Sequence, residues 1–246
     1  MKIRSIILFI LILLQSPVAG QNATNKIKIS DDIDLIQLSP NAYIHVSRAS
    51  MGSFGMVSSN GLIFIDKGKA FLFDTPANNT QTRTLVKWVE DSLHVRFAGF
   101  VPNHWHGDCM GGLGYLKARH IPSYANRMTI TLARQHHLPV PDKGFKDSLI
   151  LHLGNKRVEC YYPGKGHSTD NIVVWIPSEK ILFAGCMVKE MKANTKGNLS
   201  DADVKAWPAT IKKVMAKFPS ARIVIPGHGE AGGFELLQHT IDVVCK

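Results

Sequence analysis

A series of short apolar runs, rich in β-branched and aromatic residues, limits most strongly the folds that this chain can adopt. Turn-forming residues such as Ser59-Asn60-Gly61 and Pro177-Ser178 bound these runs. The pattern predicts strands, and they fall at residues 43–46, 62–65, 70–73, 97–101, 149–153, 158–162, 172–176, 181–184 and 223–225.

Helical patterns alternate with the predicted strands through the whole chain. In the segment 80–93, apolar side chains recur near the 3.6-residue period of a helix. Similar patterns predict helices at 113–119, 128–137, 201–218 and 234–244, and Pro208 is a candidate kink early in the segment 201–218. Because strands and helices are mixed throughout, the sequence favours an α/β layered fold, and the lack of repeats and linkers favours one domain.

The amino-acid composition excludes several classes of protein. The chain has 246 residues, of which 45% are hydrophobic and 20% are charged, so it is neither a disordered chain nor a small disulfide scaffold. Its formal net charge of +10 fits either a basic soluble surface or the steering of anions. We do not expect nucleic acid as a partner, because no Lys/Arg block is interleaved with aromatic residues.

The N-terminus has the three parts of a secretory signal peptide. Lys2 and Arg4 precede an unbroken apolar run at 6–14, and small residues follow at 17–20. The run is too short to span a bilayer as a permanent helix. We therefore expect residues 1–20 to be removed, which leaves a mature domain of residues 21–246 in the periplasm without a stable membrane anchor.

The segment after the predicted strand 97–101 carries a cluster of metal-binding residue types. His104 and His106 are two residues apart, so on an extended segment both imidazoles face the same way. A turn through Gly107 would bring Asp108 beside them. Two imidazoles and a carboxylate suit a borderline divalent ion, most readily zinc. The alternative is an incidental polar loop.

Three more metal-capable side chains lie at strand ends next to glycine. His167 sits in a Gly-flanked turn before the strand 172–176, Cys186 follows the strand 181–184, and His228 follows the strand 223–225. Each alone is weak evidence, since a lone His is more often a surface or core group. Together with the His104–Asp108 segment they make four strand ends of this kind, each on a loop that glycine lets approach closely, and four in one chain are hard to assign to chance.

In this order, the six side chains resemble the ligand pattern of the metallo-β-lactamase superfamily. The Cys at position 186 resembles subclass B1, and the segment 103–109 resembles the Bacteroides-type enzymes in particular. The resemblance implies a four-layer αβ/βα sandwich with the metal site at one edge of two sheets. It also implies a monomeric, zinc-dependent hydrolase that opens penicillins, cephalosporins and carbapenems and confers antibiotic resistance. A thioesterase or phosphodiesterase of the same fold, and an exported zinc-binding protein without catalysis, are the alternatives.

The same resemblance implies two zinc ions per chain. The first would be held by three imidazoles and the second by a carboxylate, a thiolate and an imidazole: His104, His106 and His167 for the first, Asp108, Cys186 and His228 for the second. Asp108 would also orient the attacking hydroxide.

The resemblance also implies roles for residues that bind substrate. Lys189 matches the lysine that pairs with the substrate carboxylate, and Asn198 matches the asparagine that polarises the lactam carbonyl. Met51 and Phe54 lie in a Gly-punctuated segment that resembles a mobile flap. The alternatives are a solvated lysine, a helix-capping asparagine and a hairpin whose apolar residues belong to the core.

Two further residues are expected in a second layer around the metals. Asp74 resembles the family aspartate that braces the ligand loop, although it could simply form a turn. Cys109 stands where many B1 enzymes have Arg, so its thiol should change the electrostatics near the second zinc. Whether Cys160 and Cys245 form a bridge cannot be read from their spacing.

Overall fold

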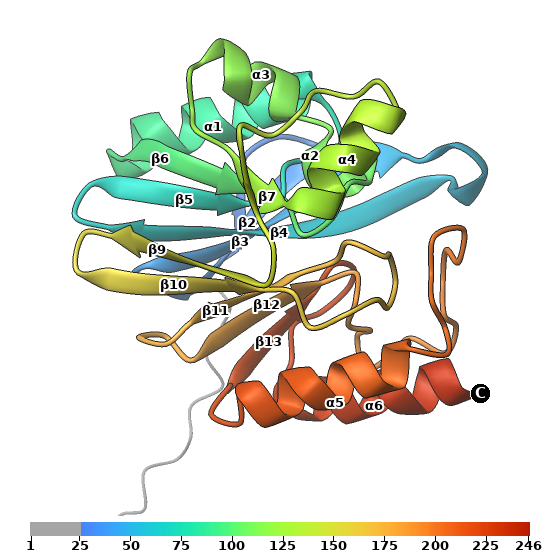
Figure 1. Ribbon diagram of the computed structural model, residues 1–246. Coiled ribbons are helices and arrows are strands. Elements are labelled where there is room, and N and C mark those ends of the chain that lie inside the picture. Colours follow the sequence, from blue (N-terminus) through green and yellow to red (C-terminus); the bar gives the residue numbers. More distant parts are fainter. Residues whose placement is uncertain (1–25) are drawn as a thin grey trace, which may run out of the picture.

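Two β-sheets packed face to face form the centre of the computed structural model, which describes residues 26–246 (Figure 1). The first sheet runs in the order β1 (Lys26–Lys28), β2 (Ile33–Ser39), β3 (Ala42–Ser50), β4 (Met56–Asp66), β5 (Lys69–Phe73), β6 (Arg96–Val101). The second runs in the order β13 (Ile223–Pro226), β12 (Ile181–Gly185), β11 (Val173–Ile176), β10 (Lys156–Tyr161), β9 (Ser148–Leu153). Two short strands, β7 (Tyr124–Asn126) and β8 (Lys143–Phe145), pair separately.

Helices cover the outer face of each sheet, which makes the expected four-layer αβ/βα arrangement (Figure 1). On the first sheet lie α1 (Asn79–Leu93), α2 (Gly107–Met110), α3 (Leu113–Ala118) and α4 (Arg127–Gln135). On the second lie α5 (Trp207–Lys217) and α6 (Glu235–Cys245). No helix among residues 26–246 is long and apolar enough to cross a membrane.

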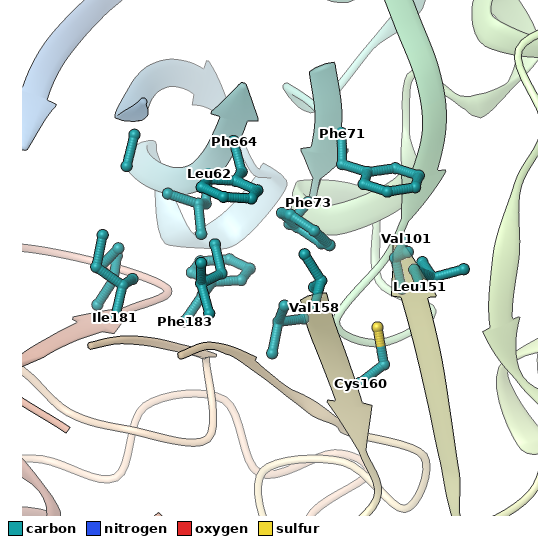
Figure 2. Close-up of a cluster of buried hydrophobic side chains, with 14 of the residues drawn as sticks. Leu62, Phe64, Phe71, Phe73, Val101, Leu151, Val158, Cys160, Ile181 and Phe183 are labelled. Carbon is teal, nitrogen blue, oxygen red and sulfur yellow. The ribbon is translucent and has the colours of Figure 1, made fainter. Parts of the chain in front are cut away.

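The space between the sheets is filled by large apolar side chains. Phe64, Phe73 and Phe183 are fully buried there, and Val158 and Leu62 pack beside them (Figure 2). Burial of each large apolar side chain contributes about 1.5–3 kcal/mol relative to leaving it in water. Separate apolar clusters join the first sheet to α1 and α3 and the second sheet to α5 and α6. The sandwich is therefore a rigid support for the loops at its edge.

All the predicted strands are present, but the predicted helix 201–218 is too long. Helix α5 begins at Trp207, so Pro208 lies in its first turn and produces no kink. Proline is tolerated there because the main-chain N–H groups of the first turn have no acceptor within the helix, so the N–H that proline lacks is not missed. The Asp203 side chain accepts the Ala206 N–H at 3.0 Å, which fixes the entry to the helix. Strands β1, β2, β7 and β8 were not predicted, and the predicted leader, residues 1–20, lies outside the described residues.

Candidate metal centre

Strand ends from both sheets meet at one edge of the sandwich. Strands β5 and β6 are parallel, as are β12 and β13, so the carboxyl ends of each pair point the same way. Asp74 follows β5, His104 follows β6, Cys186 follows β12 and His228 follows β13. The topology thereby gathers side chains that are far apart in the sequence.

Three imidazoles converge at this edge. The Nε2 atom of His104 lies 2.9 Å from Nδ1 of His106, and the ring centroid of His167 lies 5.0 Å from that of His104. His104 and His167 are buried, and burial lowers the pKa of both, to about 3 for His167. Both rings are therefore neutral at physiological pH, and a neutral imidazole has the lone pair that a metal ion requires.

A thiol, a carboxylate and an imidazole meet beside the three rings. Cys186 Sγ lies 3.4 Å from Asp108 Oδ2 and 3.3 Å from His228 Nε2. A hydrogen bond from Cys109 lowers the pKa of Cys186 to about 6, so this side chain is largely thiolate at neutral pH. Burial alone would raise the pKa of Asp108, but the hydrogen bond with His228 holds it below its usual range.

The donor set fits zinc. Burial opposes protonation of His228, yet the negative charges of Cys186 and Asp108 raise its pKa well above the usual value. The field at this point therefore favours a cation. Ligand atoms of His104, His106 and Asp108 lie within 4.8 Å of one another, as do those of Asp108, Cys109 and Cys186. Imidazole, thiolate and carboxylate are the ligands that zinc takes in proteins.

Outer partners fix which nitrogen of each ring faces the cluster. His106 Nε2 lies 2.5 Å from Asp201 Oδ2, and His228 Nδ1 donates to the carbonyl of Ser58 at 2.9 Å. These contacts leave His106 Nδ1 and His228 Nε2 directed toward the cluster. Asp201 and Ser58 were not predicted from the sequence, because they lie 95 and 170 residues from their partners.

The residues expected in the second layer also reach this edge. The Asp74 carboxylate is fully buried and accepts the main-chain N–H of Asn103 at 2.5 Å, directly before the histidine segment. Cys109 is buried with its sulfur 3.2 Å from His104 Nδ1. Asn103, which the sequence did not indicate, donates from its side chain to the carbonyls of Ile172 and Ala184 and so joins the two sheets below the cluster.

A cleft of about 430 Å³ opens above the cluster. Its walls include Met51, Phe54, Lys189 and Asn198 together with His106, Asp108, His167 and His228. Phe54 is 62% exposed on a 3-10 turn, Gly52–Phe54, at the tip of the β3–β4 hairpin. Figure 1 shows this tip on the same side of the molecule as the orange loop between β12 and α5. The cleft therefore combines an apolar flap, a cation and the metal-ligand cluster.

Lys189 and Asn198 both lie on that orange loop. The Nζ atom of Lys189 is 5.3 Å from the centroid of the Trp207 ring, and burial lowers the pKa of Lys189 while Cys186 opposes the shift. Asn198 Oδ1 accepts the Ser200 N–H at 3.1 Å, a local turn rather than the cap of a helix. Its Nδ2 amino group is then the part of the side chain that can donate to a ligand.

All four cysteines are free thiols among residues 26–246. Cys160 is buried in the core between the sheets (Figure 2), whereas Cys245 is exposed at the end of α6. Cys160 and Cys245 therefore do not form a disulfide.

Comparison with known proteins agrees with this geometry. The profile of the Metallo-beta-lactamase superfamily matches residues 104–228. A protein of Bacteroides fragilis called "Metallo-beta-lactamase type 2" is 57% identical over 96% of this chain and 94% of its own length. A Pseudomonas aeruginosa protein of the same name is 34% identical over 87% of this chain and 85% of its own.

Solved structures give the same result for the fold. A metallo-beta-lactamase from Pontibacter korlensis has a TM-score of 0.84 and 34% identity, and the match covers 87% of this chain and 99% of that one. The DIM-1 metallo-beta-lactamase exposed to ceftazidime has a TM-score of 0.83 and 36% identity over 87% of this chain and 96% of that one.

Proposed function

Because this chain belongs to the metallo-β-lactamase superfamily, in its B1 class, and is a hydrolase of β-lactams, we propose that it opens penicillins, cephalosporins and carbapenems with two zinc ions. The observation that carries the proposal is the cleft in which side chains from two neighbouring ligand sets lie together with Lys189 and Asn198. The first set is His104, His106 and His167, and the second is Asp108, Cys186 and His228.

Zinc at these ligands supplies Lewis acidity and lowers the pKa of a water to about 7, the two requirements for amide hydrolysis at neutral pH. The three imidazoles of the first set would hold one zinc ion, which would supply this chemistry to a water or to the substrate. The second set carries two negative charges, from Asp108 and Cys186, next to the reacting groups. One carboxylate oxygen of Asp108 accepts a hydrogen bond from the attacking water and orients it toward the lactam carbonyl.

Protein side chains position the substrate over these sets. Lys189 pairs with the carboxylate that penicillins, cephalosporins and carbapenems carry next to the lactam ring. Asn198 donates its Nδ2–H to the lactam oxygen, where negative charge develops during attack. Met51 and Phe54 on the hairpin cover the apolar part of the substrate, and the glycines beside them allow the hairpin to move.

Nitrocefin hydrolysis with and without a chelator tests the proposal. We expect activity to vanish with chelator and to return with zinc, and atomic absorption to give two zinc ions per chain. Cys186→Ser should bind about one, since a hydroxyl is a poorer ligand than a thiolate. Activity on thioesters or phosphodiesters alone would support the other hydrolases of this fold. Zinc binding without any hydrolysis would support a binding protein.

We also propose that the protein is exported to the periplasm as a monomer and confers antibiotic resistance. The support is the signal-peptide pattern of residues 1–20 and the absence of any later apolar run of that kind in the sequence. Mass spectrometry of the mature N-terminus in a periplasmic fraction tests export. Light scattering tests the oligomeric state, and carbapenem susceptibility of cells that express the protein tests resistance.

A further inference from the structure

The C-terminal helix contacts the main chain of Lys189 through one hydroxyl. Thr240, in the middle of α6, is fully buried, and its Oγ1 accepts the Lys189 N–H at 2.9 Å. The same hydroxyl donates to the carbonyl of Leu236 at 2.7 Å. The hydroxyl therefore donates one hydrogen bond and accepts another, and the donated bond fixes the orientation in which Oγ1 receives the Lys189 N–H.

Thr240 does not line the cleft that contains Lys189. Helix α6 lies on the outer face of the second sheet (Figure 1), so the hydroxyl acts on Lys189 from behind the loop. The same helix holds the loop a second time, where His239 Nε2 donates to the carbonyl of Ala193 at 2.9 Å. Helix α6 thus fixes both ends of the segment 189–193.

The other contacts near Lys189 act on Met187, two residues before it, or on the far end of its side chain. Trp207 Nε1 donates to the Met187 carbonyl at 2.8 Å, and the Trp207 ring lies 5.3 Å from Lys189 Nζ. These two contacts hold the chain before Lys189 and the ammonium group itself. The bond to Thr240 is the one that fixes the main-chain position from which the lysine side chain extends.

We propose that Thr240 is a positioning residue for substrate binding: its hydroxyl fixes the main chain of Lys189 and thereby places the ammonium group for the substrate carboxylate. This inference rests on the proposed role of Lys189. A residue that acts only through Lys189 changes the affinity for the carboxylate and leaves zinc binding and the chemical step unchanged. A purely structural threonine, whose hydroxyl only bonds back to Leu236 as threonines in helices often do, would not show this selectivity.

Thr240→Val and Thr240→Ser form a matched pair, because valine keeps the β-branched shape without the hydroxyl and serine keeps the hydroxyl. We expect Thr240→Val to raise KM about three- to tenfold for a cephalosporin with its free carboxylate, with kcat and zinc content unchanged. Thr240→Ser should stay within about twofold of the wild type in KM, because it retains the hydroxyl. Gln238→Ala, an exposed change on the same helix, is the control. If Thr240→Val lowers Tm markedly, Thr240→Ala is the second variant for the same comparison.

A double-mutant cycle with Lys189→Ala separates the two roles. In the Lys189→Ala background, Thr240→Val should raise KM no further, and neither variant should change KM for the carboxylate methyl ester. Wild-type KM in Thr240→Val, or an equal effect in both backgrounds, would overturn the inference while leaving the role of Lys189 intact. A normal KM in Lys189→Ala would instead refute the role of the lysine, and with it the inference.

Discussion

Ser58 and His228 are 170 residues apart in the chain, yet the carbonyl oxygen of Ser58 accepts the Nδ1–H of His228 at 2.9 Å. Strand β4 of the first sheet therefore orients a ring that belongs to a loop of the second sheet. Asn60, two residues along β4, reinforces this contact. Its Nδ2 donates to the carbonyls of Pro226 and Gly229 at 2.9 and 2.8 Å, and its main-chain N–H donates to that of Gly227 at 2.8 Å.

Asn60→Asp should weaken zinc binding at the second ligand set. Aspartate has nearly the same shape but no side-chain donor, so the carbonyls of Pro226 and Gly229 lose their partner, and the buried Pro226 carbonyl left unpaired costs about 1–3 kcal/mol. We expect a lower Tm and a zinc content near one per chain at limiting zinc. Ser58→Ala is the matched control, because Ser58 acts through its main chain and its side chain is exposed. Full zinc content in Asn60→Asp would contradict the prediction.

Asp201→Asn should weaken zinc binding at the first ligand set instead. The Asp201 carboxylate lies 2.5 Å from His106 Nε2 and so keeps Nδ1 as the coordinating atom. Loss of such a partner typically costs about 10–100-fold in metal affinity. Competition with a chromophoric chelator measures the affinity, and the exposed carboxylate variant Asp32→Asn is the control. An unchanged affinity would mean that the ring is oriented by the surrounding packing alone.

The ligands could be predicted from the sequence, whereas their partners could not. His104, His106 and Asp108 are close in the chain and end a strand, and glycine neighbours mark His167, Cys186 and His228. Asp201 and Ser58 carry no such local mark. Their role arises only when loops of different sheets meet, and a contact of that kind leaves no periodicity or spacing in the sequence.

The secondary structure also divides into elements that could be predicted from the sequence and elements that could not. Strands buried on both faces, such as β5 and β12, were predicted because their apolar runs are unbroken. Strand β2 was missed because polar Asp34 and Gln37 interrupt its apolar residues, and β1, β7 and β8 have only three residues each. The helix 201–218 was extended too far because its apolar pattern continues through Val204, although that residue precedes the start of α5 at Trp207.

His45 should make the stability of the protein depend on pH in the acidic range. Its ring is buried, Nε2 contacts the Asp74 carbonyl at 2.9 Å, and Nδ1 has no partner among the described residues. Burial lowers the pKa of His45 to about 4. Because the unfolded chain takes up this proton near pH 6.5 and the folded protein does so only near pH 4, stability falls as the pH drops through that window.

The variant His45→Gln isolates this contribution, since glutamine retains a side-chain N–H but does not titrate. Between pH 7 and pH 4.5, the free energy of unfolding should fall by about 2–3 kcal/mol more in the wild type than in His45→Gln. Urea titrations of both proteins measure the difference. They are done without zinc, so that protonation of the metal ligands contributes equally to both proteins. Parallel pH profiles would show that His45 is not the group responsible.

Cys109 should control the survival of the protein after zinc is removed. Its sulfur lies within 4.8 Å of the Cys186 sulfur, and both side chains are buried. Burial raises the pKa of Cys109, whereas the hydrogen bond from Cys109 lowers that of Cys186 to about 6, so a thiolate lies beside a thiol. Bound zinc engages the Cys186 thiolate. Without zinc, dissolved oxygen can take two electrons from the pair together with the thiol proton of Cys109, which gives hydroperoxide and leaves a disulfide in which Cys186 can no longer bind metal.

We therefore expect wild-type protein that has been stripped by chelator and exposed to air to regain little nitrocefin activity when zinc is added, unless a reductant is present. Cys109→Ser should keep most of its activity before chelation, because Cys109 is not a proposed ligand, and should recover after the same treatment. Mass spectrometry would show a loss of about two mass units in the oxidised wild type, the two hydrogens lost on disulfide formation. Equal recovery of the two proteins would refute the idea. If Cys109→Ser were inactive before chelation, Cys109 would instead belong to the metal site itself, because its hydrogen bond with His104 Nδ1 would then be required to hold that ligand.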